Sequence, residues 1–469
     1  LCFINGSVPG DWNKSCIVPL YKGKGDVRMC GSYRGISLLS VVGKVYGKVI
    51  IERIREWTEH KVGEEQSGFR AGRGCMDQVF AVRQIVEKML DKHKDVYFAF
   101  MDLEKAYDKI DRDALWKVLS MYGVRGKLLN AVKSFYKGSV ACVRIGNSTS
   151  DCFSVNVGLR QGCVMSPWLF NVYMDGVVRE VKDNTEGIGI NLVDKNGVKW
   201  IMSRLLYADD TTLVAESEEN LQHLVNQFEK ACARRKLKVN ANKSKVMVCS
   251  TVTNQGVVKI QLNGEILEEV NSFRYLGSMV SRGSGVHVDV KHKIMQGRAV
   301  CGALRRVWTN RKLGMDVKKV LYEGIVVPTV LYGGETWGLK VTERKKLNVM
   351  EMNCLRSMCG VNRRDRVRNE DIRQRVGICH ELAERVDMKA LSWYGHVMRM
   401  NESRLTLRVY ESKVEGYRGR GRPKMSWREG VKKALIVRGL DEANSMVLCK
   451  EKLEWRHFVR CIRADEVEM

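Results

Sequence analysis

The 469-residue chain carries 80 Lys and Arg residues against 54 Asp and Glu, a net charge of +26. Such an excess attracts polyanions, so nucleic acid is the favoured partner, and the length allows roughly two to four folded units. No apolar run is long enough to span a bilayer and no basic amphipathic helix dominates, so we expect no membrane association.

Cysteine and proline usage indicates a reducing environment and a folded chain. Fifteen cysteines without paired spacing predict buried thiols rather than a disulfide framework, and therefore an intracellular protein of the cytoplasm and nucleus. Only five prolines and no low-complexity tract predict structure nearly throughout. The chain starts at Leu1 without a signal-peptide pattern, and we interpret it as a fragment.

Hydrophobic periodicity in the first hundred residues predicts two helices and a strand. Val42, Val45, Val49 and Ile50 recur at the spacing of one helix face and predict a helix through residues 42–50. A second helix is predicted over residues 77–90. The continuous apolar run 96–101 predicts a buried strand, and Asp102 stands at its end.

The next stretch contains a short helix and a hairpin. Asp111 or Asp113 caps the expected helix, and Gly123 closes it. Residues 141–145 are expected to pair with residues 153–157 across a turn over the residues between them.

Further along, the pattern predicts another helix and a second hairpin. Ser166 is expected to cap a helix that has Pro167 in its first turn. Residues 204–207 and 211–215 are expected to form a hairpin with Ala208-Asp209-Asp210 at its tip, followed by a helix capped by Ser217. The fold class predicted is α+β.

The last third is expected to be mainly helical and more basic from about residue 286. Asn263-Gly264, between alternating runs just before it, predicts another hairpin. Residues 363–375 contain a cluster of arginines. Further on, Gly419-Arg420-Gly421-Arg422-Pro423 resembles a hook that inserts arginines into a DNA minor groove. A plain basic loop is the more ordinary interpretation of that pentapeptide.

Three aspartates could carry metal-dependent chemistry. Phosphoryl transfer from a nucleoside triphosphate uses two divalent ions about 3.5 to 4 Å apart, and Mg²⁺ prefers carboxylate oxygens. Asp102, Asp209 and Asp210 would supply such a cage. Neighbours on a regular strand point to opposite faces, so Asp209 and Asp210 can share a site only if the hairpin turn re-aims one of them. An isolated Asp-Asp pair is usually a solvated turn; the buried strand before Asp102 and the basic charge favour catalysis instead.

Seven short segments around these aspartates occur in a fixed order. The set resembles the reverse transcriptases of non-LTR (long interspersed element-type) retrotransposons, closely over residues 12–285 and more loosely to about 340. Two resemble fingers motifs, four resemble motifs A to D and the last resembles the primer grip; they are residues 32–40, 65–73, 102–108, 158–167, 207–210, 240–244 and 273–278.

The resemblance implies roles for individual residues of the metal site. Asp102 and Asp209 would be the main ligands of two Mg²⁺ ions, for which Mn²⁺ could substitute, and Asp210 a weaker third carboxylate. Lys243 matches the lysine that protonates pyrophosphate. Tyr107 matches the steric gate against a ribose 2′-hydroxyl; taken without the family it would be a core aromatic.

Four more residues match positions that hold the incoming nucleotide. Arg34 and Lys22 match triphosphate ligands of the fingers, although elsewhere each would be a solvated base. Gln161 matches a glutamine near the incoming sugar and base, and Gly162 lets backbone approach closely. Gly35 departs from the family, in which many members have proline, and this removes no chemical group.

The resemblance also implies the architecture and the reaction. The fold would be a right-hand polymerase with fingers (1–95), palm with an inserted fingers segment and the primer grip (96–285), helical thumb (286–340) and a basic, mainly helical nucleic-acid-binding region (341–469). The reaction would copy element RNA into DNA from a DNA primer 3′-hydroxyl at the target, using dNTPs, with an endonuclease domain either lost or upstream of Leu1.

Two other functions stay open at this point. A domesticated fragment could bind nucleic acid without catalysis, although retention of all three carboxylates argues against it. A group II intron-type maturase shares Tyr207-Ala208-Asp209-Asp210, but residues 36–40 favour the retrotransposon. Cys354, Cys359, Cys379, His380 and His396 have poor spacing for zinc, and we expect packed thiols there.

Overall fold

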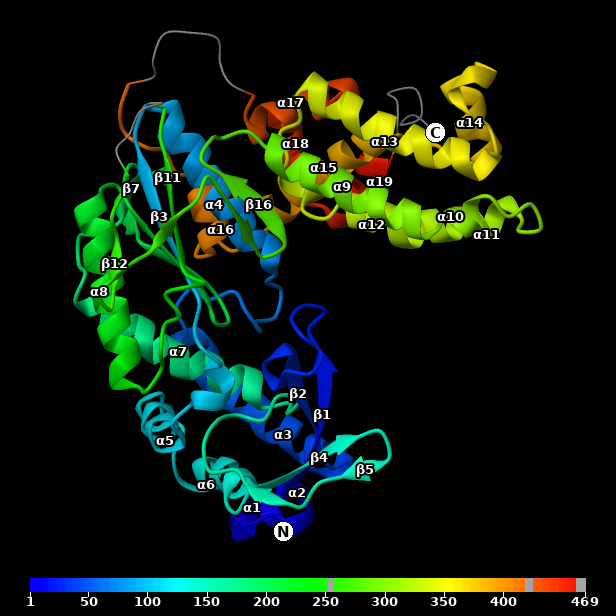
Figure 1. Cartoon of the computed structure of the whole chain (residues 1–469). Helices are drawn as coiled ribbons and strands as arrows, with labels where there is room; N and C mark the ends of the chain where they lie inside the picture. Colours follow the sequence, from blue (N-terminus) through cyan, green and yellow to red (C-terminus); the bar gives the residue numbers. More distant parts are fainter. Residues whose placement is uncertain (252–256, 418–424, 461–469) are drawn as a thin grey trace.

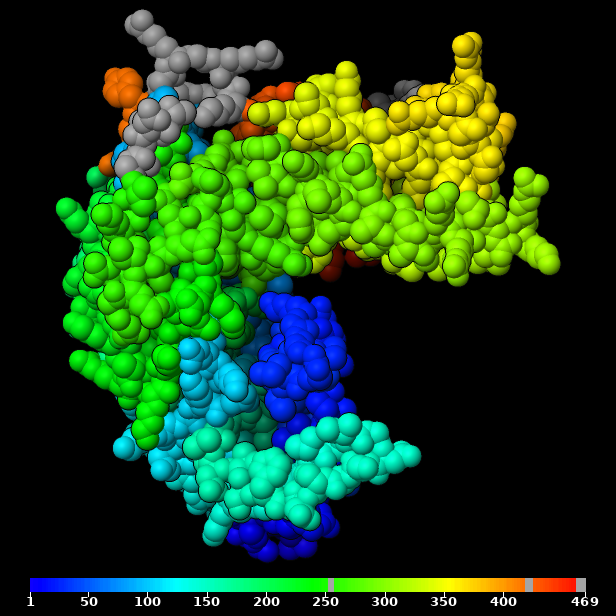
Figure 2. All heavy atoms as spheres, in the orientation of Figure 1, coloured from blue at the N-terminus to red at the C-terminus, as the bar shows by residue number. Residues whose placement is uncertain are grey.

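The computed structural model describes residues 1–251, 257–417 and 425–460. The chain forms an arc in which a lower arm, built from the N-terminal part, faces an upper arm of helices that follow residue 286 (Figure 1). Figure 2 shows that the side chains leave the space between the arms hollow on this face. The predicted α+β class, with a mainly helical C-terminal part, is confirmed.

The sheet at the middle of the arc is built around β3 (Val96–Met101). This strand pairs antiparallel with β10 (Asp210–Ala215) on one side and β11 (Lys245–Cys249) on the other. The sheet order is β14-β11-β3-β10-β9, with β9 (Arg204–Tyr207) and β14 (Glu268–Glu269) at the edges. The central position of β3 explains why its sequence is continuously apolar.

Alternate residues of β3 face two different layers of helices, as the two-residue period of a strand requires. Phe98 and Phe100 share a buried cluster with α4 (Cys75–Asp91). Ala99 and Met101 pack in the cluster of α7 (Ser166–Asp183) and α8 (Glu218–Arg234) on the opposite face. The sheet is therefore covered on both sides.

A second sheet forms much of the lower arm. β1 (Lys14–Tyr21) pairs antiparallel with β2 (Tyr33–Leu38) and parallel with β4 (Val140–Ile145). The predicted hairpin after β4 exists but turns earlier: β4 pairs with β5 (Ser148–Thr149) and then with β6 (Phe153–Ser154). The return strand is thus broken over residues 150–152, which the sequence did not indicate.

The helix predicted through residues 42–50 is α3 (Val41–Thr58), but its buried face differs from the expected one. Val42 and Val45 are 61 % and 62 % exposed, whereas Ile50 is buried. The inward face near the helix start carries glycines instead: a Cβ at Gly43 would lie 3.3 Å from the Trp12 ring. Because α3 is apolar on both sides, the pattern could not distinguish them.

Helix starts are confirmed with one correction. Asp111 accepts from the Ala114 amide at the start of α5 (Arg112–Met121), and Ser217 accepts from the Asn220 amide at the start of α8. Ser166, however, is the first residue of α7 rather than its cap. Its hydroxyl lies 3.2 Å from the Tyr136 hydroxyl, so the serine packs inside the helix bundle.

The helical part begins with α9 (His287–Ala303) and shares one buried cluster from Val286 to Val386. The cluster contains residues on both sides of residue 340, the predicted end of the thumb. The domain boundaries stay predictions. Later helices return to the sheet layer, where the Trp427 ring lies 4.6 Å from the Phe80 ring of α4. The remaining bounds are α10 (Arg305–Trp308), α11 (Met315–Leu321), α12 (Val327–Val330), α13 (Val341–Cys359), α14 (Asn369–Val376), α15 (Leu382–Met398), α16 (Leu405–Glu411), α17 (Trp427–Val437), α18 (Glu442–Leu448) and α19 (Lys452–Arg460).

Short elements complete the chain. The hairpin predicted at Asn263-Gly264 is confirmed as β12 (Gln261–Leu262) and β13 (Glu265–Ile266). The others are α1 (Cys2–Asn5), α2 (Gly10–Asn13), α6 (Gly126–Tyr136), β7 (Ile190–Val193), β8 (Lys199–Met202), β15 (Ser272–Tyr275) and β16 (Ser278–Ser281).

Candidate active site

The three predicted aspartates meet at one edge of the central sheet. Asp102 follows β3 directly, and Asp210 begins β10. Thr211 pairs with Met101 in the antiparallel register, so one step further Asp102 stands opposite Asp210. Asp209 lies in the two-residue turn that joins β9 to β10. Residues about a hundred positions apart in the sequence are thereby brought together.

The turn that carries Asp209 has unusual backbone geometry. Ala208 adopts a φ of 58°, in the left-handed region that non-glycine residues rarely enter. This rotation breaks the strand alternation that would send Asp209 and Asp210 to opposite faces. The rotation at Ala208 therefore allows the re-aiming that the sequence analysis predicted.

The carboxylates interact electrostatically. Burial, followed by the charges of Asp209 and Asp102, raises the pKa of Asp210 to about 6. Burial and the Asp102 charge also raise the pKa of Asp209, while Arg34 and Lys243 oppose that rise. Repulsion between neighbouring carboxylates is the condition that a divalent cation relieves, so the donor set fits Mg²⁺ chemically.

The side chains of the site have suitable chemistry for a metal ion but are not arranged around one position. Within the described ranges, no group of three or more His, Cys, Asp or Glu side chains is arranged to hold a metal ion. The Lys243 ammonium lies 3.2 Å from Asp102 Oδ2 and forms an ion pair with it. An ion bound at Asp102 would take the place of that ammonium.

Lys243 reaches Asp102 because its loop is tied to the end of β3. The Asn240 amide donates to the Asp102 carbonyl at 2.8 Å. The Asp102 amide donates to the Ser244 hydroxyl at 3.1 Å, and that hydroxyl donates to the Asn240 carbonyl at 2.8 Å. Ser244 is fully buried, so these bonds fix the loop that carries the exposed lysine.

Tyr107 lies on the short helix after Asp102, in an aromatic stack. Its ring is parallel to the Phe170 ring at 4.5 Å and meets the Phe69 ring edge-on at 6.4 Å. The hydroxyl is buried and has no hydrogen-bond partner among the residues that the structure describes. Burial, with the Asp209 charge, raises the pKa of Tyr107, which keeps the phenol neutral beside the carboxylates.

Gln161 and Gly162 lie against the lower-arm sheet. The Ser37 amide of β2 donates to the Gln161 carbonyl at 2.7 Å, and Gln161 Nε2 donates to Asp108 Oδ1 at 3.4 Å. Gly162 has a φ of 107°, and a Cβ there would lie 2.6 Å from the Ser37 carbonyl oxygen. Only glycine allows this approach, as expected for a position where backbones come close.

The two basic candidates act on different carboxylates. Arg34 is exposed on β2, and its charge opposes the rise in the pKa of Asp209 that burial causes, so this charge reaches the site. Lys22 follows β1 and donates to the Gly31 carbonyl at 2.8 Å. Lys22 acts instead on Asp108. Burial raises the pKa of Asp108, and this rise is opposed by Lys105, Gln161 and Lys22.

A family model described as reverse transcriptase (RNA-dependent DNA polymerase) matches residues 21–280, more than half of the chain. The chain belongs to the reverse transcriptase family. The reverse transcriptase resemblance predicted from seven motifs is confirmed, and with it the enzyme class, RNA-dependent DNA polymerase. Members of the family generally depend on divalent metal and use an RNA template.

Curated relatives come from mobile elements. The reverse transcriptase is 24 % identical over 344 residues to the RNA-directed DNA polymerase from mobile element jockey of Drosophila funebris, covering 70 % of this chain and 36 % of the relative. It is 26 % identical over 365 residues to the probable RNA-directed DNA polymerase from transposon BS of Drosophila melanogaster, covering 75 % and 38 %. The chain thus spans little more than a third of these relatives.

Among solved structures, apo telomerase from Candida tropicalis superposes with a TM-score of 0.46 at 12 % identity, covering 97 % of this chain and 70 % of that one.

None of the helices in the described part of the chain has the length and apolarity needed to cross a membrane.

Several predictions concern residues away from the carboxylates. The minor-groove hook at 419–423 lies outside the described residues. Cys354 is buried and Cys379 is exposed; of the described cysteines, five are buried, fewer than expected. Two residues that received no role from the sequence, Gln66 and Arg83, make buried polar contacts over long sequence distances. The one sequence feature that could have indicated these contacts is a polar residue within an otherwise apolar or glycine-rich segment.

Proposed function

We propose that this reverse transcriptase extends a DNA 3′-hydroxyl on an RNA template at a two-Mg²⁺ site held by Asp102 and Asp209, with Asp210 as a supporting carboxylate. The observation that carries the proposal is the strand register, which sets Asp102 opposite Asp210 with Asp209 in the adjoining turn. Bound Mg²⁺ would activate the attacking hydroxyl and neutralise the leaving pyrophosphate.

The chain's own residues would bind and orient the dNTP. Arg34, whose charge reaches Asp209, and Lys22 would hold the triphosphate. The Tyr107 ring, fixed by Phe170, would exclude a 2′-hydroxyl. Gln161 would contact the sugar and base where its loop approaches β2.

Lys243 would serve as the proton donor to pyrophosphate. Its ammonium already lies 3.2 Å from Asp102, so a small side-chain movement would bring it to a leaving group bound there. The loop contacts of Asn240 and Ser244 support this placement because they leave only the lysine side chain free to move.

The larger architecture would guide template and primer. In this proposal residues 1–95 are fingers, 96–285 palm, 286–340 thumb and 341–469 a basic nucleic-acid-binding region. The hollow between the arms would receive the RNA–DNA heteroduplex, held by phosphate contacts and by its A-form shape (Figure 2). Copying element RNA at a nicked genomic target would take place in the nucleus.

Primer extension tests the proposal. The chain is supplied with an RNA template, a DNA primer, dNTPs and Mg²⁺, and incorporation is compared between wild type and Asp209→Asn. We expect wild type to incorporate dNTPs and the variant to lose at least about 1,000-fold, because a metal ligand is removed. Salt-sensitive RNA binding by a folded wild type without any Mg²⁺-dependent synthesis would instead identify a catalytically silent nucleic-acid-binding fragment.

A further inference from the structure

The backbone at Ala208 is held in an intrinsically unfavourable conformation. Left-handed geometry brings the Cβ of an L-residue close to the following carbonyl, so alanine adopts it only where its surroundings compensate. Ala208 directly precedes Asp209, and its φ sets the direction in which the aspartate leaves the turn. Whatever stabilises Ala208 therefore positions Asp209.

The side chain of Gln66 makes the contacts that hold Ala208. Its Oε1 accepts from the Ala208 amide at 2.8 Å, and its Nε2 donates to the Ala208 carbonyl at 3.2 Å. Gln66 is 3 % exposed, so these bonds are shielded from water. A carboxamide presents a donor and an acceptor together and can satisfy both backbone groups of one residue; a carboxylate cannot.

The backbone around Gln66 is itself fixed to the catalytic hairpin. The Leu206 amide donates to the Glu65 carbonyl and the Ser67 amide donates to the Leu206 carbonyl, each at 2.9 Å. The Gln78 amide group from α4 reaches the Leu206 carbonyl at 3.1 Å and the Ser67 hydroxyl at 2.7 Å. Residues 65–67 thus extend the sheet beside β9, 140 positions away in sequence.

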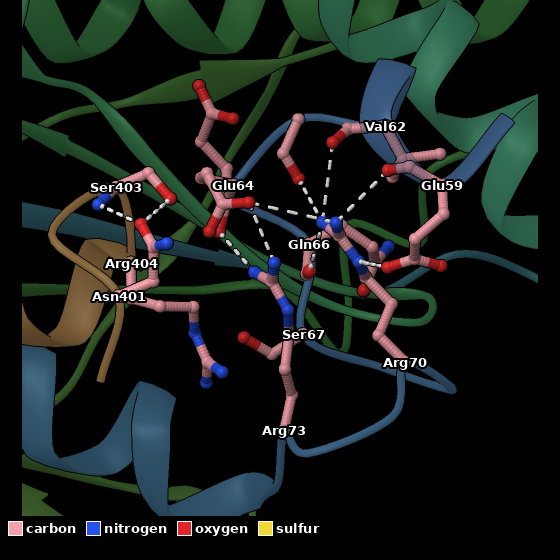
Figure 3. A network of polar contacts seen from close by, with 12 residues as sticks. Glu59, Val62, Glu64, Gln66, Ser67, Arg70, Arg73, Asn401, Ser403 and Arg404 are labelled. Carbon is pink, nitrogen blue, oxygen red and sulfur yellow. Dashed lines mark hydrogen bonds and ion pairs between the residues drawn. The ribbon is translucent and has the colours of Figure 1, made fainter. Parts of the chain in front are cut away.

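The buried side chain of Arg70 also holds this segment in place. Arg70 Nη1 donates to the carbonyls of Gly63 at 2.7 Å and of Gln66 at 3.3 Å (Figure 3). Its Nε forms an ion pair with Glu59 Oε1 at 2.8 Å. The Gln66 side chain is therefore presented from a rigid loop and loses little freedom when it binds Ala208.

Gly68 provides an independent indication that close contact with the turn matters. A Cβ at Gly68 would lie 2.3 Å from the Ala208 nitrogen, so no side chain is tolerated there. The Gly68 amide donates to Gln66 Oε1 at 2.8 Å, and the Gly68 carbonyl accepts from Asn171 Nδ2 at 2.6 Å. The loop is shaped to bring the Gln66 carboxamide against Ala208.

We propose that Gln66 is a positioning residue for catalysis, whose carboxamide holds Ala208 in the left-handed conformation that aims Asp209 at the metal site. This inference rests on the proposed function for its kinetic consequence, but its structural part concerns the turn alone. Substitution of Gln66 should loosen the turn without changing how the chain holds template and primer.

Gln66→Met removes both hydrogen bonds at similar volume and is the main test. Its matched control is Gln84→Met, another buried glutamine, which donates to Glu87 at 3.1 Å on α4. Hydrogen exchange of the peptide over 206–211 should accelerate in Gln66→Met and stay unchanged in Gln84→Met, because the Ala208 amide loses its acceptor. This readout does not depend on enzymatic activity.

The kinetic readout is single-turnover incorporation against Mg²⁺ concentration. In Gln66→Met we expect the rate to fall about 10- to 100-fold, or the half-saturating Mg²⁺ to rise several-fold, with template–primer affinity within about twofold of wild type. Gln84→Met should match wild type. If Gln66→Met does not fold, Gln66→Asn, whose side chain is one methylene shorter and holds its carboxamide too far from Ala208 to make both bonds, replaces it with the same expectation.

The possible results separate the two claims. Unchanged exchange in a folded Gln66 variant, or faster exchange with an unchanged rate and Mg²⁺ dependence, would overturn the positioning role. An inactive wild type whose turn still exchanges faster in Gln66→Met would overturn the proposed function while leaving the structural role of Gln66 intact.

Discussion

Arg83 and Asp289 form a buried ion pair, with Nη2 2.6 Å from Oδ2, that joins α4 of the central layer to α9 at the start of the helical part. The same carboxylate accepts from Trp337 Nε1 at 2.9 Å and from the Met279 amide of β16 at 2.8 Å. Arg83 also donates to the Thr336 hydroxyl at 2.8 Å. One carboxylate thus connects α4, β16, α9 and the loop before α13.

Removal of one partner of this pair should destabilise the chain strongly. Asp289 is fully buried, so Arg83→Met leaves an uncompensated charge without access to water. We expect the free energy of unfolding in urea to fall by about 3 to 5 kcal/mol. The double variant Arg83→Met/Asp289→Asn, which no longer buries a lone charge, should recover part of that loss.

An exposed ion pair supplies the control for this prediction. Lys195 and Glu402 lie 2.7 Å apart, but their side chains are 47 % and 81 % exposed. Lys195→Met should therefore cost no more than about 1 kcal/mol. Equal effects of the two substitutions would show that the Arg83–Asp289 pair is solvated and does not join the layers.

The sugar discrimination assigned to Tyr107 should depend on its ring and not on its hydroxyl. Within the described part of the chain the hydroxyl has no hydrogen-bond partner, whereas the ring stacks on Phe170. Tyr107→Val should therefore raise rNTP incorporation relative to dNTP by about 10- to 100-fold, and Tyr107→Phe should leave the ratio unchanged. The measurement is kcat/KM for dCTP and CTP on one RNA template. Unchanged selectivity in Tyr107→Val would contradict the steric role.

Asp210 should make stability depend on pH. Its pKa of about 6 in the folded chain lies above the ordinary value, so the folded state binds a proton more tightly than the unfolded state. The stability that this proton contributes is present at pH 4 and is lost as pH rises through about 6. Because Asp210 is exposed, we expect the loss to be about 1 to 2 kcal/mol rather than the full value of the shift.

Thermal unfolding without divalent ions at pH 5 and pH 8 measures this effect. Asp210→Asn should be more stable than wild type at pH 8 by more than it is at pH 5. Asp11→Asn, at a side chain that is 87 % exposed, serves as the control and should show no such difference. Addition of Mg²⁺ at pH 8 should stabilise wild type more than Asp210→Asn; equal stabilisation would mean that Asp210 does not contribute to ion binding.

The sequence predicted the catalytic strands well because local signals determine them. A continuous apolar run ending at Asp102 and two short runs around Ala208-Asp209-Asp210 are sufficient to place a central strand and a hairpin. Conversely, the buried face of α3 could not be predicted. The helix carries valines and isoleucines on all of its faces, and glycines make its close contacts.

Polar contacts between residues far apart in the chain could not be predicted from the sequence either. Gln66 and Ala208 are 142 positions apart, and Arg83 and Asp289 are 206 apart. No periodicity links such residues, since their pairing depends on how the layers pack. The motif that contains Gln66 was recognised, but its contact with the catalytic turn became visible only in three dimensions.

Iron-mediated backbone cleavage tests the metal site most directly. Fe²⁺ replaces Mg²⁺ in the folded chain, and ascorbate with peroxide generates radicals that cut the backbone next to the bound ion. The account predicts cuts close to residues 102 and 209 in the same molecule, suppressed by excess Mg²⁺ and lost in Asp209→Asn. Cuts elsewhere in the chain, or cuts near residue 209 that persist in Asp209→Asn, would contradict the assignment of these carboxylates as the metal site.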